Sequence, residues 1–495
     1  MTSPHLPVLM VVLPLMAAPV AVLIRRNTPA WSLAAVITWI CLAIAITLLN
    51  RVLDTGTISY ALGGWAAPWG IEYRIDRIGA FMLVIVSAIG AVVVPYARAS
   101  VAREISPDRQ YLFYAMYLLC LAGLLGIAIT GDAFNLFVFL EISSLSSYFL
   151  IALGRQRRAL RAAFHYLVQG TIGATFLLIG IGLMYMMTGT LNMADLAERI
   201  DAVQDTRTIR VALAFVVIGL AIKAAIFPLH AWLPNAYGFA PNPVAAFLAG
   251  TATKVSIYIL VRFVFGLFGG DFSFGNLELG DALLPIALAG ALIPSLVALY
   301  QKDAKAVLAY SSVAQIGYMV LGIALASAAG LAASLLHLFN HAMMKTALFL
   351  AVGAVVLRVG SSSLDQFNGI GRRMPWTMAA FVAAGLSLIG VPPTAGFVSK
   401  WLLLEAALES GAAGIVAAIV VIASSVIAVF YVGRIVERAY FRMPAPGHAN
   451  IADAPLSILL PLWVLAGAGI WFGLATDLPL ETARSAAAAL SGPLP

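Results

Sequence analysis

The sequence is poor in charge. Asp, Glu, Lys and Arg make up only 10% of its 495 residues, whereas soluble domains carry about 25%. Hydrophobic residues account for 62%, and the mean hydropathy is +0.98. A soluble protein is therefore excluded. Apolar stretches of about 20 residues, the length that spans the hydrocarbon core as a helix, recur along the whole chain and predict an all-α polytopic membrane protein.

Cysteine and the common catalytic motifs are equally scarce. The two cysteines, Cys41 and Cys120, lie in apolar stretches, which excludes a disulfide framework and an iron–sulfur or zinc site. No glycine-rich phosphate loop follows a predicted strand, and no nucleophile–base pair is present. The basic residues form no stripe interleaved with aromatics, which argues against nucleic acid. We expect no cofactor, and a transporter subunit rather than an enzyme.

The first apolar run, His5 to Ile24, has no basic residue before it and is followed directly by Arg25 and Arg26. A cleavable signal peptide is not expected from this pattern. The first span is expected to enter from outside, with the two arginines on the cytoplasmic side. The alternate connections that then face the cytoplasm hold more than twice as many Lys and Arg residues as the others, which predicts both termini outside.

Apolar runs between charged or Pro/Gly-rich breaks predict fourteen transmembrane helices. They cover approximately residues 4–24, 31–50, 78–97, 111–130, 133–153, 162–187, 211–228, 243–268, 282–300, 305–327, 330–357, 375–404, 413–436 and 454–474. Between the second and third, the glycines and prolines from Tyr60 to Arg77 leave two interpretations open, a small external hairpin or an irregular loop.

Two of these helices are expected to be broken. Pro228 lies late in the seventh, and Pro392 and Pro393 lie near the middle of the long twelfth. A break leaves backbone polar groups without their helical hydrogen bonds, and at membrane depth such groups are tolerated only inside protein or beside a hydrated cavity. Paired broken helices therefore indicate a transport site. Helices 4–8 and 9–13 form two blocks of five with the broken helix fourth in each, which predicts two inverted five-helix repeats. The expected divisions are 1–110 (helices 1–3), 111–268 and 269–440 (the repeats), and 441–495 (helix 14).

Ionisable residues inside the spans are few. Of 22 acidic residues, only Glu141 falls well inside a span, in the run NLFVFLEISSLSSYFL. A carboxylate in hydrocarbon is costly, so it indicates a function, with a structural ion pair as the alternative. Arg262 is interpreted as an anchor whose long stem reaches the interface. The buried lysines, one each in helices 7, 8, 11 and 12, are Lys223, Lys254, Lys345 and Lys400.

Helix 11 contains the sequence HLFNHAMMKT, which sets His337, His341 and Lys345 at successive i, i+4 positions on one face. This stripe is suited to passing a proton by short hops, because histidine titrates near neutral pH and burial draws the pKa of lysine toward it. The alternatives are core histidines held by neighbouring hydroxyls, and a metal site. No acid and no third ligand lies beside the stripe, which argues against a metal. For His230, just past Pro228, a place in the relay and a role in capping the broken helix both remain open.

A buried glutamate beside a buried lysine makes a switch. The lysine stays charged while its counterion is close, and desolvation favours loss of the proton when the pair separates. Repeating such steps from Lys254 through the helix 11 stripe to Lys400 predicts a proton relay near mid-membrane.

Together with KAAIFPLHAWLPNAYGFAPNPV from Lys223 and GVPPTAGFVSK ending at Lys400, these residues resemble the antiporter-like subunits of Mrp-type cation/proton antiporters, respiratory complex I and membrane-bound hydrogenases. Within this superfamily the chain is most similar to the D subunits of Mrp antiporters. The similarity rests on the phrase TGTLNMADL, on a length that ends before the lateral helix of the larger subunits, and on lysine at position 400. The resemblance implies that Glu141 pairs with Lys223 in a first half-channel, that Lys254 bridges to helix 11, and that Lys400 gates a second. It also implies assembly with other membrane subunits in a bacterial cytoplasmic membrane.

Three hypotheses follow. The first is a subunit of an antiporter that exchanges sodium or another monovalent cation for protons. The second is the proton-pumping arm of a redox complex, where electron transfer in a partner drives the same relay. The third, a subunit that only braces a neighbour, predicts that apolar residues can replace the buried charges with little loss.

Overall fold

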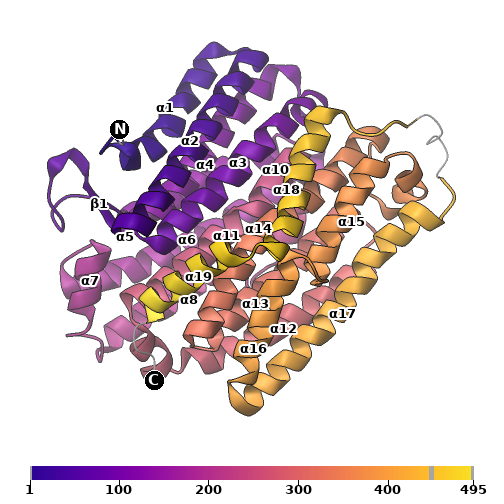
Figure 1. The fold of residues 1–495 in the computed structure, drawn as a ribbon. Coiled ribbons are helices and arrows are strands. Elements are labelled where there is room, and N and C mark those ends of the chain that lie inside the picture. The colour runs from indigo at the N-terminus through magenta and orange to yellow at the C-terminus, as the bar shows by residue number, and fades with distance from the viewer. Residues whose placement is uncertain (1–2, 445–450, 492–495) are drawn as a thin grey trace.

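Helices make up most of the computed structural model, which describes residues 3–444 and 451–491, and the long helices run side by side (Figure 1). The helices are α1 (Leu6–Ile24), α2 (Asn27–Thr55), α3 (Arg77–Glu104), α4 (Gln110–Ile129), α5 (Ala133–Ala152), α6 (Arg157–Thr188), α7 (Met193–Ile200), α8 (Arg207–Ala224), α9 (Trp232–Phe239), α10 (Asn242–Gly250), α11 (Ala252–Val261), α12 (Leu279–Tyr300), α13 (Ala304–Ala324), α14 (Ala328–Val359), α15 (Pro375–Ile389), α16 (Ala395–Leu408), α17 (Gly411–Phe441), α18 (Leu456–Leu474) and α19 (Asp477–Ser491). The strands are β1 (Ile58–Ala61) and β2 (Glu72–Ile75).

Twelve helical segments of the described chain are long and apolar enough to cross a membrane, judged by length and composition. They coincide with twelve of the fourteen predicted spans, and the all-α polytopic fold is confirmed. The other two predicted spans are the broken ones. The seventh corresponds to α8, which is 18 residues long but carries three basic residues, Arg207, Arg210 and Lys223. The twelfth is divided between α15 and α16, each of which is too short to cross a membrane alone.

The breaks fall at the predicted prolines. After α8 the chain leaves the helix at Ala225, which has a left-handed φ of 56°, and Pro228 lies in the non-helical stretch before α9. After α15 it leaves at Gly390, with φ of 91°, and Pro392 and Pro393 precede α16. Proline lacks the amide hydrogen that would continue the helical ladder. A third interruption, at Thr251 between α10 and α11, contains no proline and was not predicted.

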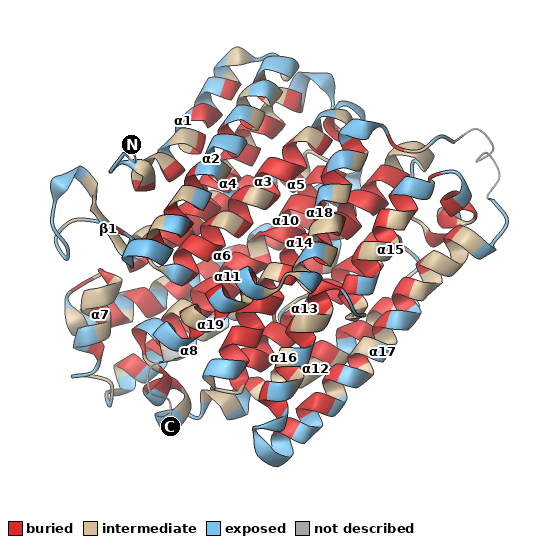
Figure 2. Ribbon diagram, viewed as in Figure 1, coloured by how far each residue is buried: buried red, intermediate tan, exposed pale blue. Residues whose placement is uncertain are grey.

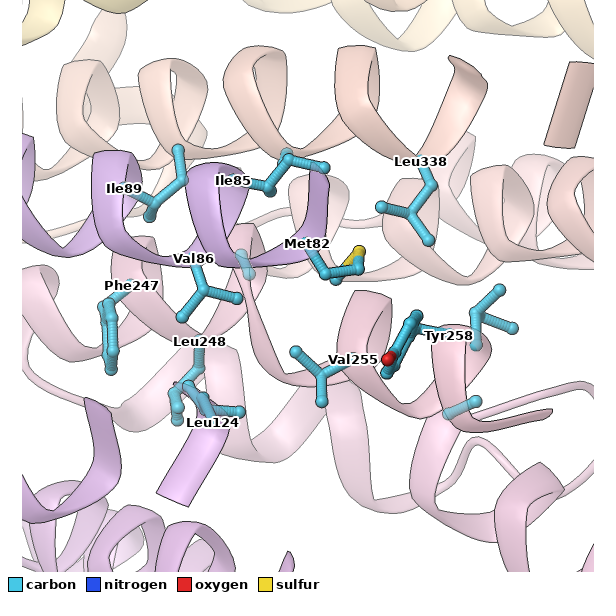
Figure 3. Packing of buried hydrophobic residues seen from close by; sticks show 14 of the residues in the cluster. Met82, Ile85, Val86, Ile89, Leu124, Phe247, Leu248, Val255, Tyr258 and Leu338 are labelled. Carbon is cyan, nitrogen blue, oxygen red and sulfur yellow. The ribbon is translucent and has the colours of Figure 1, made fainter. Parts of the chain in front are cut away.

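The most buried helices lie at the centre of the bundle (Figure 2). All nine residues of α10 are buried, and α13 and α14 are buried over most of their length. Figure 3 shows how α3 packs into this centre, with Met82 and Val86 beside Phe247 of α10 and Val255 of α11. Peripheral helices such as α17 instead expose large apolar side chains, as expected for contact with lipid or with other membrane helices.

The two ends of the bundle differ. At one end β1 and β2 form an antiparallel hairpin, with Ile58 opposite Ile75, so of the two interpretations the structure has the hairpin. Tyr73 of this hairpin bridges to Thr130 at the end of α4. α3 starts beside the hairpin and is 28 residues long, about 42 Å, so Glu104 lies at the opposite end of the bundle. The helix α19, which was not predicted, packs across α14 and α3.

Candidate functional site

Glu141 and Lys223 form a buried ion pair. Asp132 caps α5 by accepting a hydrogen bond from the amide of Asn135, and Glu141 follows in the middle of that helix. Lys223 lies in the last turn of α8, next to the break. Its Nζ is 3.2 Å from Glu141 Oε1 and donates to Ser144 Oγ at 2.8 Å. The lysine side chain is 2% exposed and the glutamate 23%, so the pair is largely shielded from solvent.

A small cavity of about 10 Å³ lies between Lys223 and α11. Ser144, Ser147 and Lys223 line one side, and Ala252 and Ser256 of α11 line the other. A volume of roughly 10–15 Å³ holds one water molecule when polar partners surround it. The site is therefore suited to a water between Lys223 and the helix that carries Lys254.

Lys254 lies at the unpredicted interruption between α10 and α11. Its Nζ donates to the carbonyl oxygen of Ala249, near the end of α10, and approaches Thr253 Oγ1 at 3.4 Å. A cation is favourable at this position because the last carbonyls of a helix carry partial negative charge. No carboxylate pairs with Lys254 among the described residues. A β-carbon at Gly250 would collide with Thr346 Oγ1 of α14, so the interruption packs directly beside the residue that follows Lys345.

The predicted stripe on α14 is fully buried and faces α13 and α16. His337 makes two hydrogen bonds, one between Nδ1 and Ser399 Oγ and one between Nε2 and Gln315 Oε1, both at 2.9 Å. Lys345 Nζ donates to the Leu308 carbonyl at 2.8 Å and to Ser311 Oγ. His341 lies between them, with its ring stacked 6.0 Å from that of His337.

His341 is the least satisfied residue of the stripe. It is 0% exposed, and neither ring nitrogen has a hydrogen-bond partner among the described residues. Buried polar atoms of this kind are normally satisfied by protein or by ordered water. His341 is therefore the member of the stripe whose polar atoms the described residues leave unsatisfied.

Lys400 lies in α16, just past the second broken segment. Its Nζ donates to the carbonyl oxygens of Leu388 and Ile389 at the end of α15, at 3.0 and 2.9 Å, and to Ser425 Oγ at 3.0 Å. The break frees these carbonyls from the helical ladder, and the lysine satisfies them. Nζ also lies 5.0 Å above the ring of Tyr318, whose edge contacts His337. Ser399, the neighbour of Lys400, thus connects it to the stripe.

Two other residues complete the set of ionisable candidates. His230 lies in the first break, where its ring stacks on Phe227 and its Nδ1 has no partner among the described residues, so a place in a relay and a capping role both stay predictions. Arg262 does not act as a lone anchor but pairs through both terminal nitrogens with Asp76, the N-cap of α3. Burial raises the pKa of Asp76, but the charge and hydrogen bonds of Arg262 outweigh burial and hold that pKa below its usual value. No cluster of three His, Cys, Asp or Glu suited to a metal occurs in the described part of the chain.

Glu104 and Lys305 were missed as candidate site residues. The predicted third span stops at residue 97 because Arg98 and Arg103 interrupt the apolar run, whereas α3 continues to Glu104. Lys305 begins the predicted tenth span, 305–327, and was expected at the membrane surface, yet it is only 5% exposed. It lies in the first turn of α13 after the cap residue Asp303.

Comparison with known proteins agrees with this geometry. Residues 130–427 match the family described as NADH:quinone oxidoreductase/Mrp antiporter, transmembrane. The chain is 43% identical to NADH-quinone oxidoreductase subunit N of Desulforudis audaxviator over 94% of its own length and 95% of that protein. It is 34% identical to the D subunit of the Na(+)/H(+) antiporter of Alkalihalophilus pseudofirmus over 74% of its own length and 73% of that protein. Its structure is similar to a chain of the Mrp complex from Dietzia sp., with a TM-score of 0.90, 29% identity, and 99% and 98% coverage.

Proposed function

Because the chain belongs to the NADH:quinone oxidoreductase/Mrp antiporter family of membrane subunits, we propose that it moves protons as one subunit of a multisubunit monovalent cation/proton antiporter. The observation that carries this proposal is the buried line of ionisable groups from Glu141 through α14 to Lys400, in which Lys223, Lys254 and Lys400 lie beside helix breaks. Buried lysines without a counterion are difficult to explain by stability alone.

The first step of the proposed mechanism is the Glu141–Lys223 switch. While the pair is closed, the carboxylate stabilises the ammonium form of Lys223. When the pair opens, the buried ammonium is left uncompensated and releases its proton to the water site beside α11. Lys254 accepts the proton there.

The next steps follow α14. Neutral Lys345 takes the proton from Lys254 across the Gly250–Thr346 contact. Water around His341 passes it to His337, which then reaches Lys400 through the hydroxyl of Ser399. Lys400, held by three neutral acceptors, releases it on the far side. Each step moves one proton and leaves the donor neutral, ready for the next.

A second candidate is the proton-pumping arm of a redox complex. The observation that favours it is the 43% identity to a NADH-quinone oxidoreductase subunit. The relay chemistry would be the same, with the driving conformational change supplied by electron transfer in partner subunits. Under both candidates the chain works with other membrane subunits in a bacterial cytoplasmic membrane, with both termini outside.

The deciding experiment measures proton movement in inverted vesicles that contain the whole assembled complex. An imposed sodium gradient and an electron donor are applied separately to wild type, Glu141→Gln, Lys400→Ala and the exposed-site control Glu409→Gln. Under the antiporter proposal sodium drives proton flux in wild type and the control, and the two relay variants abolish it. Flux driven only by the donor selects the redox candidate. Unchanged flux in both relay variants would show that the buried line is structural.

A further inference from the structure

A cavity of about 730 Å³ opens at the end of the bundle opposite the hairpin, the end that the distribution of Lys and Arg assigns to the cytoplasm. Arg103, Arg155 and Arg158 lie at its exposed rim, and Asp303 lies on its wall. Glu104 and Lys305 line its inner part. At about 30 Å³ per molecule the cavity holds roughly two dozen waters. Bulk water therefore reaches this carboxylate and this ammonium.

Glu104 and Lys305 hold the same short connection between α9 and α10. The amide of Asn242 donates to Glu104 Oε2 at 2.9 Å, and Lys305 Nζ donates to the Ala240 carbonyl at 3.1 Å. Ser100 donates a further hydrogen bond to Glu104. The two opposite charges thus lie on either side of Pro241. Unlike Glu141 and Lys223, they form no direct ion pair within 4 Å among the described residues, but they supply the same two chemical groups.

The connection leads toward the relay by two short routes. The first route runs along α13, which carries Lys305 and also Leu308 and Ser311, the two residues that bind Lys345. Ser311 follows Lys305 by six residues, a rise of about 9 Å along the helix. On the other side, the Asn242 amide nitrogen Nδ2 lies 3.4 Å from the carbonyl oxygen of Gly353, two i+4 steps beyond Lys345 on the same face of α14.

Asn242 is an independent sign of water on this path. The residue is 0% exposed, and its Oδ1 has no hydrogen-bond partner among the described residues. A buried acceptor of this kind requires a water or a proton-carrying group to satisfy it.

We propose that Glu104 and Lys305 form the cytoplasmic proton entrance of the relay. This inference rests on the proposed relay function. Water in the cavity delivers a proton to neutral Lys305, and the Glu104 carboxylate stabilises the resulting ammonium. Lys305 then transfers the proton, through water near Asn242, to neutral Lys345 and becomes neutral again. Lys345 is thus the junction at which this entrance meets the steps from Glu141, Lys223 and Lys254.

The first test compares lysine variants of the whole complex in inverted vesicles. Lys305→Met should lower proton exchange by roughly 10-fold or more, whereas Lys302→Met, an exposed lysine three residues earlier, should exchange like wild type. Lys305→Arg keeps the charge beside Ala240 but cannot release a proton, so it should fail as Lys305→Met does. Normal exchange in an assembled Lys305→Met complex, with Glu141→Gln inactive, would overturn the entrance alone. Normal exchange in both variants would overturn the relay as well.

The second test does not change either charged residue. Gly238 lines the cavity, and a β-carbon there meets nothing within 4 Å, so Gly238→Cys should fold normally. The two native cysteines are buried. A charged, membrane-impermeant thiol reagent should label Gly238→Cys in inverted vesicles but not in right-side-out vesicles, and labelling should stop most of the exchange. Full exchange after complete labelling would contradict the entrance.

Discussion

The two halves of the molecule, α4–α11 and α12–α17, share a frame but differ in chemistry. Their long helices α6 and α14 both contain 32 residues and both end at a glycine with left-handed φ, 73° at Gly189 and 83° at Gly360. Their helices α5 and α13 each begin after an aspartate cap, Asp132 or Asp303. Each aspartate bridges to the segment just after its long helix.

The broken helices also correspond. In each half a left-handed residue ends the first part of the helix, and a proline follows three positions later, Pro228 after Ala225 and Pro393 after Gly390. Asp132 lies at the hairpin end and Asp303 lines the opposite cavity. These matches support the proposal of two inverted repeats at 111–268 and 269–440.

The two halves differ in whether a carboxylate faces the lysine at the broken helix. Nine residues after Asp132 the first half has Glu141, whereas nine residues after Asp303 the second half has Ser312. Lys223 is therefore paired with a carboxylate, and Lys400 is held by two carbonyls and one hydroxyl. Corresponding backbone breaks thus hold one lysine with a carboxylate partner and one with neutral acceptors alone. Under the proposed function, this is the asymmetry that directional transfer requires.

Removing the acid from the first half should have the largest effect. Glu141→Gln keeps the shape of the side chain but leaves Lys223 without a counterion, so we expect proton exchange to fall by about 100-fold. The measurement is initial proton flux per assembled complex, with Glu409→Gln as the exposed control. Exchange within a factor of two of wild type would mean that the first half does not depend on its ion pair.

Adding an acid to the second half should make it behave like the first. Ser425→Asp places a carboxylate where a hydroxyl now accepts from Lys400 at 3.0 Å. A nearby opposite charge favours the charged lysine, so its proton is released only at higher pH, and we expect the pH dependence of exchange to move upward by about 1–3 units. Ser424→Ala, one residue earlier, serves as the control for disturbed packing in α17. An unchanged pH profile in Ser425→Asp would show that Lys400 does not limit exchange.

The sequence predicted much of this arrangement because its signals are local. Hydropathy locates spans, proline locates two of the breaks, and i, i+4 spacing places His337 and His341 on one face. The third break has no proline, and the partners Gln315 and Ser399 come from distant helices that no periodicity connects to α14. Glu104 was missed because a helix can continue past its apolar stretch when its end is packed inside the bundle.

The two histidines of the second half allow a smaller but sharper test. His341→Leu removes no hydrogen bond to any described residue, so folding should be little affected while exchange falls by roughly 10-fold. His337→Leu removes the hydrogen bonds to Ser399 and Gln315 and should also cost about 1–3 kcal/mol of stability. Thermal unfolding of the solubilised complex and vesicle exchange, measured on both variants, separate the two roles. Full activity of His341→Leu would remove this residue from the relay.

The smallest expected effect tests the shared frame itself. Asp132→Ala and Asp303→Ala each remove a helix cap, and each should cost about 1 kcal/mol of stability. Asp303 also accepts a hydrogen bond from Ser362 at 2.5 Å, so its loss should cost somewhat more. Asn at either position retains the cap and should restore most of the loss, as measured by thermal unfolding of the complex with the exposed Asp108→Ala as the control. If neither aspartate matters, the matching caps do not maintain the frame, and the correspondence between the halves then rests on the long helices and the breaks alone.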